Sequence, residues 1–179
     1  MIEKPENKKF QSEDEELAKF VTTLVQQTHA GVTLVLSTTL ERMLVTILEG
    51  NMPHLTQPLK SKLFSGYGPL ASFSSKIDLA YSLGLITAYE HRSLHAIRVI
   101  RNAFAHSDDL ELNFDHNSLV HTLAKLPDPR EKDQTKFQHF TSTVFKCQKS
   151  LQKHIETINL VSALKNLSAS KPFNKNSPK

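Results

Sequence analysis

The sequence has a single cysteine, Cys147, no tryptophan and only five glycines in 179 residues. One cysteine cannot form an intrachain disulfide or build a cysteine-based zinc site. No catalytic motif surrounds Cys147, so we interpret it as a small residue on a helix. Stretches in which β-branched and polar residues alternate are also absent. Together these absences predict an all-α fold.

The sequence also lacks long apolar runs. Residues 1–16, MIEKPENKKFQSEDEE, contain no apolar segment of the kind a signal peptide needs. No run reaches the roughly 18 apolar residues of a membrane-spanning helix. We therefore predict a cytoplasmic protein with no membrane segment. Because there is no glycine-rich phosphate loop, no pair of catalytic acids and no nucleophile motif, we also expect no cofactor.

The net charge of +4 comes largely from the C-terminal end of the chain. Four lysines there face no acidic residue: Lys165, Lys171, Lys175 and Lys179. A basic end of this kind is usually solvated and is weak support for nucleic-acid binding. We predict a flexible segment at 1–11, one all-α domain at 12–165 and a disordered basic tail at 166–179.

Helix signals in the first half of the domain predict four helices. Ser12 and Glu15 have the spacing of a capping box and suggest the start of the first helix. A second helix, over 29–50, is apolar nearly all round, which is typical of the centre of a bundle. A short helix over 56–64 and another over 70–84, ended by Gly84, follow.

The second half predicts three more helices. Thr87 and Glu90 repeat the capping-box spacing and begin a helix that Ser107 ends. A short helix over about 116–126 follows, and a long one runs from Pro129 to about Leu164. The long helix carries apolar residues at steps of three and four, so it packs along a bundle or against a second subunit. The prediction is a single bundle of six or seven helices.

The helix over 88–106 carries a polar stripe on an otherwise apolar surface. On an ideal helix the stripe covers an arc of about 80°. Its members, which we call the polar stripe, are His91, His95, Arg98, Asn102 and His106. We consider three roles for it: a surface that faces solvent, a subunit contact or a binding groove. A protein partner is the role we favour.

Arg101 projects from the same helix on its apolar side, between Leu94, Ile97 and Phe104. A buried unpaired charge is costly, so Arg101 needs an acidic partner. Glu41 and Asp78 are the candidates because each lies in an apolar segment. We predict a structural ion pair between Arg101 and one of these acids.

His91 and His95 are four residues apart, a spacing that allows both to bind one metal ion. The sequence has no H-E-x-x-H pattern and no carboxylate next to them. We therefore expect no metal site.

Two stretches together resemble the core signature of the mannitol operon repressor family. They are GPLASFSSKIDLAYSLGLI, residues 68–86, and LHAIRVIRNAFAHS, residues 94–107. The likeness extends from about Ala30 to Leu126. It implies a helical bundle and a role as a transcriptional regulator of sugar-alcohol uptake.

The second stretch also resembles the arginine–histidine motif of the HEPN superfamily of helical bundles. Arg101, Asn102 and His106 match it, with four residues between arginine and histidine. The resemblance implies metal-independent RNA cleavage across a dimer, with His106 moving a proton and Arg101 stabilising phosphate charge. However, Arg101 and His106 are about 140° apart on an ideal helix, so a shared site needs a distorted helix end or a second subunit.

A repressor invites a search for a helix-turn-helix, and residues 76–98 are the best candidate. Their would-be recognition helix begins near Thr87, and its nearly all-round apolar character does not suit a major groove. We therefore expect no direct DNA reading.

Our leading interpretation is a non-enzymatic regulator that forms a homodimer and binds another protein, such as a DNA-binding regulator. The alternative is a ribonuclease or RNA-binding protein that uses Arg101, Asn102 and His106. A third possibility, a small-molecule sensor, requires a pocket between helices.

Overall fold

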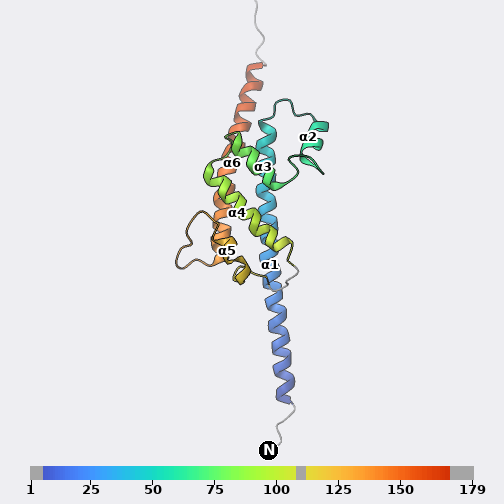
Figure 1. Cartoon of the computed structure of the whole chain (residues 1–179), viewed down its shortest axis with the longest axis vertical. Coiled ribbons are helices and arrows are strands. Elements are labelled where there is room, and N and C mark those ends of the chain that lie inside the picture. The colour runs from blue at the N-terminus through green and yellow to red at the C-terminus, as the bar shows by residue number, and fades with distance from the viewer. Residues whose placement is uncertain (1–5, 108–111, 170–179) are drawn as a thin grey trace, which may run out of the picture. The chain divides into compact units, whose positions relative to one another are not determined.

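The computed structural model describes the backbone of residues 6–107 and 112–169, and the side chains of residues 28–107 and 112–167. Every regular element in these residues is a helix (Figure 1). In chain order they are α1 (Glu6–Gly50), α2 (Gln57–Phe64), α3 (Phe73–Ser82), α4 (Ala88–Ala105), the 3-10 helix η1 (Asn117–Leu119), α5 (Val120–Leu123) and α6 (Lys136–Ala169). The predicted all-α fold with a long C-terminal helix is confirmed.

The predicted break between two N-terminal helices is wrong. α1 is one continuous helix of 45 residues from Glu6 to Gly50. The polar residues between the two predicted helices do not end it because they include no proline, and a single Gly31 costs a helix only about 1 kcal/mol. Residues 6–11, expected to be loose, are helical, whereas residues 1–5 lie outside the described residues.

The predicted start of the long last helix is also wrong, by seven residues. α6 begins at Lys136 rather than at Pro129. Thr135 ends the preceding turn, because its hydroxyl accepts the Gln138 N–H at 3.1 Å while the Gln138 side chain accepts the Thr135 N–H at 2.8 Å. This reciprocal cap fixes the first turn. α6 continues to Ala169, so residues 166–169 of the predicted tail are helical; residues 170–179 lie outside the described residues.

The helices predicted between these two ends are present, but the one predicted over 70–84 spans Phe73–Ser82, and the one predicted over about 116–126 is the short pair η1 and α5. α2 is capped by the Thr56 hydroxyl, and α3 is capped by the Ser72 hydroxyl. Gly84 ends α3 with a φ of 68°, a left-handed conformation that side chains with a Cβ rarely adopt. The Leu85 N–H then donates to the Ala80 carbonyl oxygen at 2.9 Å and closes the helix end.

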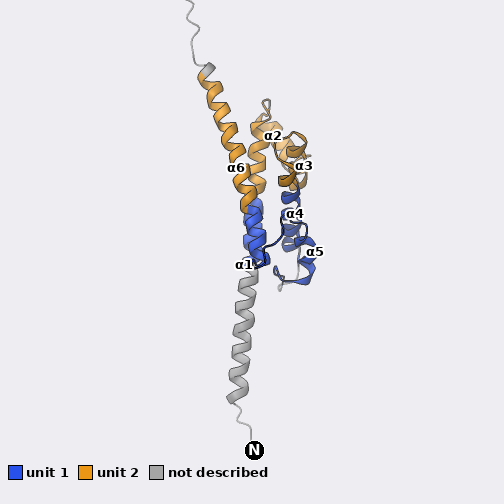
Figure 2. Ribbon diagram, turned by 90° about the vertical axis from the view of Figure 1, so that its left-hand side faces the viewer, with its two compact units in different colours: residues 1–39, 92–144 blue, residues 40–91, 145–179 orange. Residues whose placement is uncertain are grey.

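The chain forms two compact units (Figure 2). Unit 1 comprises residues 1–39 and 92–144, and unit 2 comprises residues 40–91 and 145–179. α1, α4 and α6 each contribute residues to both units. The two units are described separately.

Unit 1 is built around the aromatic ring of Phe114, which is 1% exposed. Three phenylalanine rings surround it with centroids 5.0–5.2 Å away, contributed by Phe104, Phe137 and Phe140. His29 on α1 completes the cluster: its ring lies 5.6 Å from that of Phe114 and 4.5 Å from that of Phe137. Contacts of this kind join α1, α4, α6 and the loop before η1 into one core.

Unit 2 packs residues 40–50 of α1 against α3 and the middle of α6. Its fully buried side chains include Leu40, Leu44, Ile47, Leu48, Ile77, Cys147 and Leu151. Gly50 allows the closest approach, since a Cβ there would lie 2.6 Å from Cγ2 of Ile158 on α6. Cys147 lies on a helix, as predicted, and its side chain is buried.

The segment Thr28–Gly50 of α1 is long and apolar enough to cross a membrane by length and composition alone. Our expectation that the sequence holds no such segment is therefore too strict. The core helix of a soluble protein meets the same criterion, and 33% of the tested window is buried.

Candidate functional site

Thr87 and Glu90 begin α4 with the predicted capping box. The Thr87 N–H donates to Glu90 Oε2 at 2.6 Å, and the Glu90 N–H donates to the Thr87 hydroxyl at 3.2 Å. Glu90 is only 1% exposed, and its Oε1 lies 3.5 Å from Nε2 of His154 on α6. The carboxylate therefore both caps α4 and faces α6 inside unit 2.

The pKa of Glu90 reflects this position. Burial alone would raise the pKa of the carboxyl group, because it disfavours the charged form. Hydrogen bonds from the Thr87 N–H, the Ser150 hydroxyl and the Thr87 hydroxyl, and the charge of His154, outweigh burial. As a result the pKa of Glu90 lies below its usual value, and the carboxylate is charged when it caps the helix.

Six of the fourteen side chains in the unit 1 part of α4 are buried. Five of its side chains are 0–3% exposed: Ser93, Leu94, Ala96, Ile97 and Ile100. Phe104, near its end, is 7% exposed. The polar stripe is less open than the sequence suggested, because only His106 is exposed while its other four members are half-buried. Arg98 even has its Nε buried without a hydrogen-bond partner.

Arg101, Asn102 and His106 lie at or directly after the C-terminal end of α4. The Arg101 guanidinium donates to Oδ1 of Asn102 at 3.1 Å, and both side chains are half-buried. His106 is exposed and directly follows the last residue of α4, while its N–H still donates to the Asn102 carbonyl at 3.1 Å. The structure thus joins two residues of the motif and leaves the third accessible to solvent.

Glu41, one predicted partner of Arg101, is engaged by a residue that sequence reasoning missed. Lys76 on α3 donates to Glu41 Oε1 at 2.5 Å and to the Ala71 carbonyl at 3.2 Å. Lys76 is 5% exposed, so this is a largely buried ion pair within unit 2. The apolar surroundings of Lys76 in SSKIDLAY were the available signal. An ion pair of Arg101 stays a prediction.

Asp78, the other predicted partner, hydrogen-bonds His91. Its Oδ1 lies 3.1 Å from His91 Nε2, and the His91 ring stacks on Tyr81 with centroids 4.5 Å apart. One argument against a metal at His91 was therefore wrong, because the fold does bring a carboxylate to it. The absence of a metal stays an expectation.

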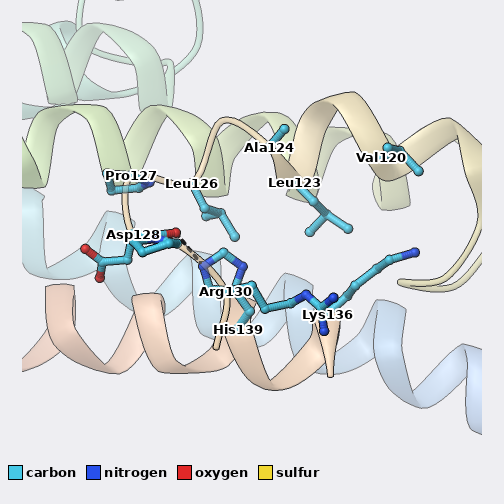
Figure 3. A pocket seen from close by; sticks show the side chains of 10 residues that line it. Val120, Leu123, Ala124, Leu126, Pro127, Asp128, Arg130, Lys136 and His139 are labelled. Carbon is cyan, nitrogen blue, oxygen red and sulfur yellow. Dashed lines mark hydrogen bonds between the residues drawn. The ribbon is translucent and has the colours of Figure 1, made fainter. Parts of the chain in front are cut away.

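A pocket of about 500 Å³ lies in unit 1, where the sequence predicted no site. It is formed by α5, the loop that follows it and the first turn of α6. Figure 3 shows Val120, Leu123 and Leu126 on one side and Arg130, Lys136 and His139 on the facing side. One wall is therefore apolar and the other carries nitrogen groups.

The loop of this pocket is held to α6 by His139, which is 8% exposed. His139 Nε2 lies 2.9 Å from the Asp128 carbonyl oxygen (Figure 3). A carbonyl oxygen only accepts, so this nitrogen carries the proton. Pro127 and Pro129 flank Asp128 and restrict the loop further. The pocket shape is thus set by a tethered, proline-stiffened loop.

A scan against protein-family models, a search of curated proteins and a search of solved structures found no match for this chain. Function must therefore be argued from the residues described above.

Proposed function

We propose that this chain is a non-enzymatic, helical-bundle regulator that acts through protein contacts and forms a homodimer. Its two signature stretches resemble the mannitol operon repressor family, which suggests transcriptional control as the process. In this proposal a DNA-binding partner reads the operator, and this chain controls that partner.

The burial of α4 is the observation that carries this proposal. A recognition helix must present its N-terminal residues to base edges in the major groove. In α4 the first-turn Glu90 is buried and used as a cap, and Leu94 and Ile97 are fully buried in cores. A helix whose first-turn carboxylate and apolar side chains are used in this way is poorly suited to a major groove, which supports a partner as the DNA reader.

The dimer contact that we propose is the C-terminal part of α6. Three apolar side chains there are 44–61% exposed: Leu160, Val161 and Leu164. Leu160 and Leu164 are four residues apart and lie on one face, as core positions of a two-helix contact do. A second copy offers the same leucines, so a symmetric contact pairs like with like.

Sedimentation velocity tests this contact with the double variant Leu160→Ser/Leu164→Ser. We expect the dimer to dissociate at least about 100-fold more readily, since each buried leucine contributes about 1.5–3 kcal/mol. Val35→Ser is the control for the loss of one exposed apolar side chain outside α6, because Val35 is 66% exposed on α1. A monomeric wild-type chain, or a dimer unaffected by the double variant, would refute the contact.

The second candidate function is RNA cleavage or RNA binding by Arg101, Asn102 and His106. The observation in its favour is the Arg101–Asn102 hydrogen bond at 3.1 Å beside an exposed His106. It requires that the imidazole of His106 act on a ribose hydroxyl. A cleavage assay distinguishes the two functions.

A further inference from the structure

The unit 1 pocket has an unusual balance of charge for an apolar cavity. Of the residues that line it, Arg130 and Lys136 are cationic and Asp128 is the one acid. Figure 3 shows the Asp128 carboxylate at the opposite end of the pocket from Lys136. The end of the pocket near Arg130 and Lys136 is therefore positively charged.

Neither cation is fully compensated by the protein. Arg130 donates to the Gln134 carbonyl oxygen, and no ion pair involves it among the described residues. A guanidinium has five N–H donors, so most of them are left for another acceptor. Lys136 pairs at 3.4 Å with Asp115, whose side chain is 81% exposed, and such a surface pair is weak. Both cations can therefore bind a ligand with little loss of interactions within the protein.

The facing wall offers a separate kind of contact. Leu123 and Leu126 are 8% and 6% exposed and present alkyl groups to the cavity beside the half-exposed Val120. A cavity of about 500 Å³ is in the range of small-molecule sites. A ligand whose apolar part packs against these side chains would have its head group next to Arg130 and Lys136.

We propose that this pocket binds a small organic carboxylate, with its apolar body against Leu123 and Leu126 and its carboxylate on Arg130 and Lys136. Arginine pairs with carboxylates through two parallel hydrogen bonds. One acid among two cations leaves a single positive charge, which matches a monoanion. This ligand site is independent of the dimer contact on α6, and it makes the chain a candidate sensor of such acids.

Isothermal titration calorimetry with three probes separates the contribution of the ligand's charged head group from that of its apolar part. Octanoate has both parts, 1-octanol has the apolar body with an uncharged head, and acetate has the head alone. We expect one saturable octanoate site per chain, octanol binding at least about tenfold weaker, and no measurable acetate binding. Equal binding of octanoate and octanol, or unsaturable binding, would overturn the proposal.

Two variants then locate the site. Arg130→Gln should weaken octanoate binding at least about tenfold through the lost charge-assisted hydrogen bonds. Arg92→Gln removes the same charge from an exposed position of α4 and should bind octanoate like the wild type. Ala124→Phe fills the pocket from its exposed rim and should abolish binding while the helical circular dichroism persists.

The position of the bound probe gives a test that does not depend on folding of the Ala124 variant. In amide NMR spectra, octanoate should shift residues 120–139 of the wild type, and Arg130→Gln should need at least about tenfold more octanoate for the same shifts. Shifts confined to the apolar residues of α6 near Leu160, or octanoate affinity that survives Arg130→Gln, would contradict the assignment.

Discussion

Thr87 and Glu90 cap α4 reciprocally: the Thr87 N–H donates to the Glu90 carboxylate at 2.6 Å, and the Glu90 N–H donates to the Thr87 hydroxyl at 3.2 Å. The carboxylate is almost fully buried and lies between the start of α4 and His154 on α6. One side chain thus combines a local function, helix initiation, with a long-range contact in unit 2.

The charge of Glu90 should make the free energy of unfolding depend on pH in the acidic range. Its pKa is lowered in the folded chain from the ordinary value of 4.5, so its stabilising effect is complete above about pH 4.5. The effect is lost as the pH falls through the lower, folded pKa. Glu90→Gln should lower the free energy of unfolding by about 1 kcal/mol at pH 7 and flatten this acid dependence.

Urea denaturation between pH 3 and pH 7 measures this effect. Glu131→Gln removes the same charge from an exposed turn position and should change the free energy of unfolding by less than about 0.5 kcal/mol. If Glu90→Gln keeps the acid dependence of the wild type, the capping carboxylate is not its source.

His29 should add a second pH dependence at higher pH. Burial lowers the pKa of His29, and the Asp115 carboxylate offsets this only in part. The unfolded chain, with a histidine pKa near 6.5, then takes up the proton more readily, so unfolding becomes easier as the pH falls below about 6.5. His29→Phe keeps an aromatic ring against Phe137 and removes a buried Nδ1 that has no partner.

We expect His29→Phe to remove the loss of stability between pH 6.5 and the folded pKa, measured as the thermal midpoint at each pH. His121→Gln, at an exposed position, serves as the matched histidine control and should follow the wild-type curve. A His29→Phe curve parallel to the wild type in this window would show that His29 is not responsible.

Breaking the Lys76–Glu41 ion pair should lower the free energy of unfolding strongly, whereas replacing both residues with apolar ones should lower it little. Glu41→Gln leaves the buried Lys76 ammonium without its counter-charge and should lower the free energy of unfolding by about 3 kcal/mol. The double variant Lys76→Met/Glu41→Leu should recover most of that loss, because two apolar side chains avoid the desolvation of two charges.

A more exposed ion pair of unit 2 gives the comparison. Lys60 and Glu49 are 2.7 Å apart with side chains 39% and 27% exposed, so Lys60→Met should cost less than about 1 kcal/mol. Chemical denaturation of all four proteins provides the values. Equal losses of unfolding free energy for Glu41→Gln and Lys60→Met would mean that burial does not make the Lys76–Glu41 pair more damaging to break.

RNA cleavage separates the regulator from the ribonuclease. We expect the purified protein to leave single-stranded RNA intact in the presence of a metal chelator. The alternative predicts cleavage products that disappear in His106→Ala and in Arg101→Ala but persist in His121→Gln. Cleavage with that pattern would replace the proposed function and leave the pocket proposal to be judged by its own titrations.

Local signals predicted local structure well. The Thr87–Glu90 cap and the Gly84 helix end depend on residues within a few positions of each other, and the chain follows them. The apolar stripe of α6 predicted the buried Phe140, Val144, Cys147 and Leu151 for the same reason. Periodicity and caps are properties that a sequence displays directly.

Two kinds of feature were not predictable in this way. One is the choice between competing local signals, and the other is the identity of a partner that lies far away in the sequence. Ser12 and Glu15 have the spacing of a helix start, yet both fit equally well inside a longer helix. Glu41 was correctly expected to need a cation, but its partner Lys76 lies 35 residues away, and several cations in the chain would have satisfied the same rule. The pocket is formed by α5, a proline-containing loop and α6, and no sequence motif indicates it.

The central claim is that this chain regulates through proteins and does not read DNA itself. The most direct measurement exposes the purified full-length chain to a library of randomised duplexes and sequences the bound fraction. We predict no enriched sequence and only weak, salt-sensitive binding, at about micromolar concentrations or above. An enriched motif bound at about 10 nM, in the range of specific DNA-binding proteins, would contradict the account.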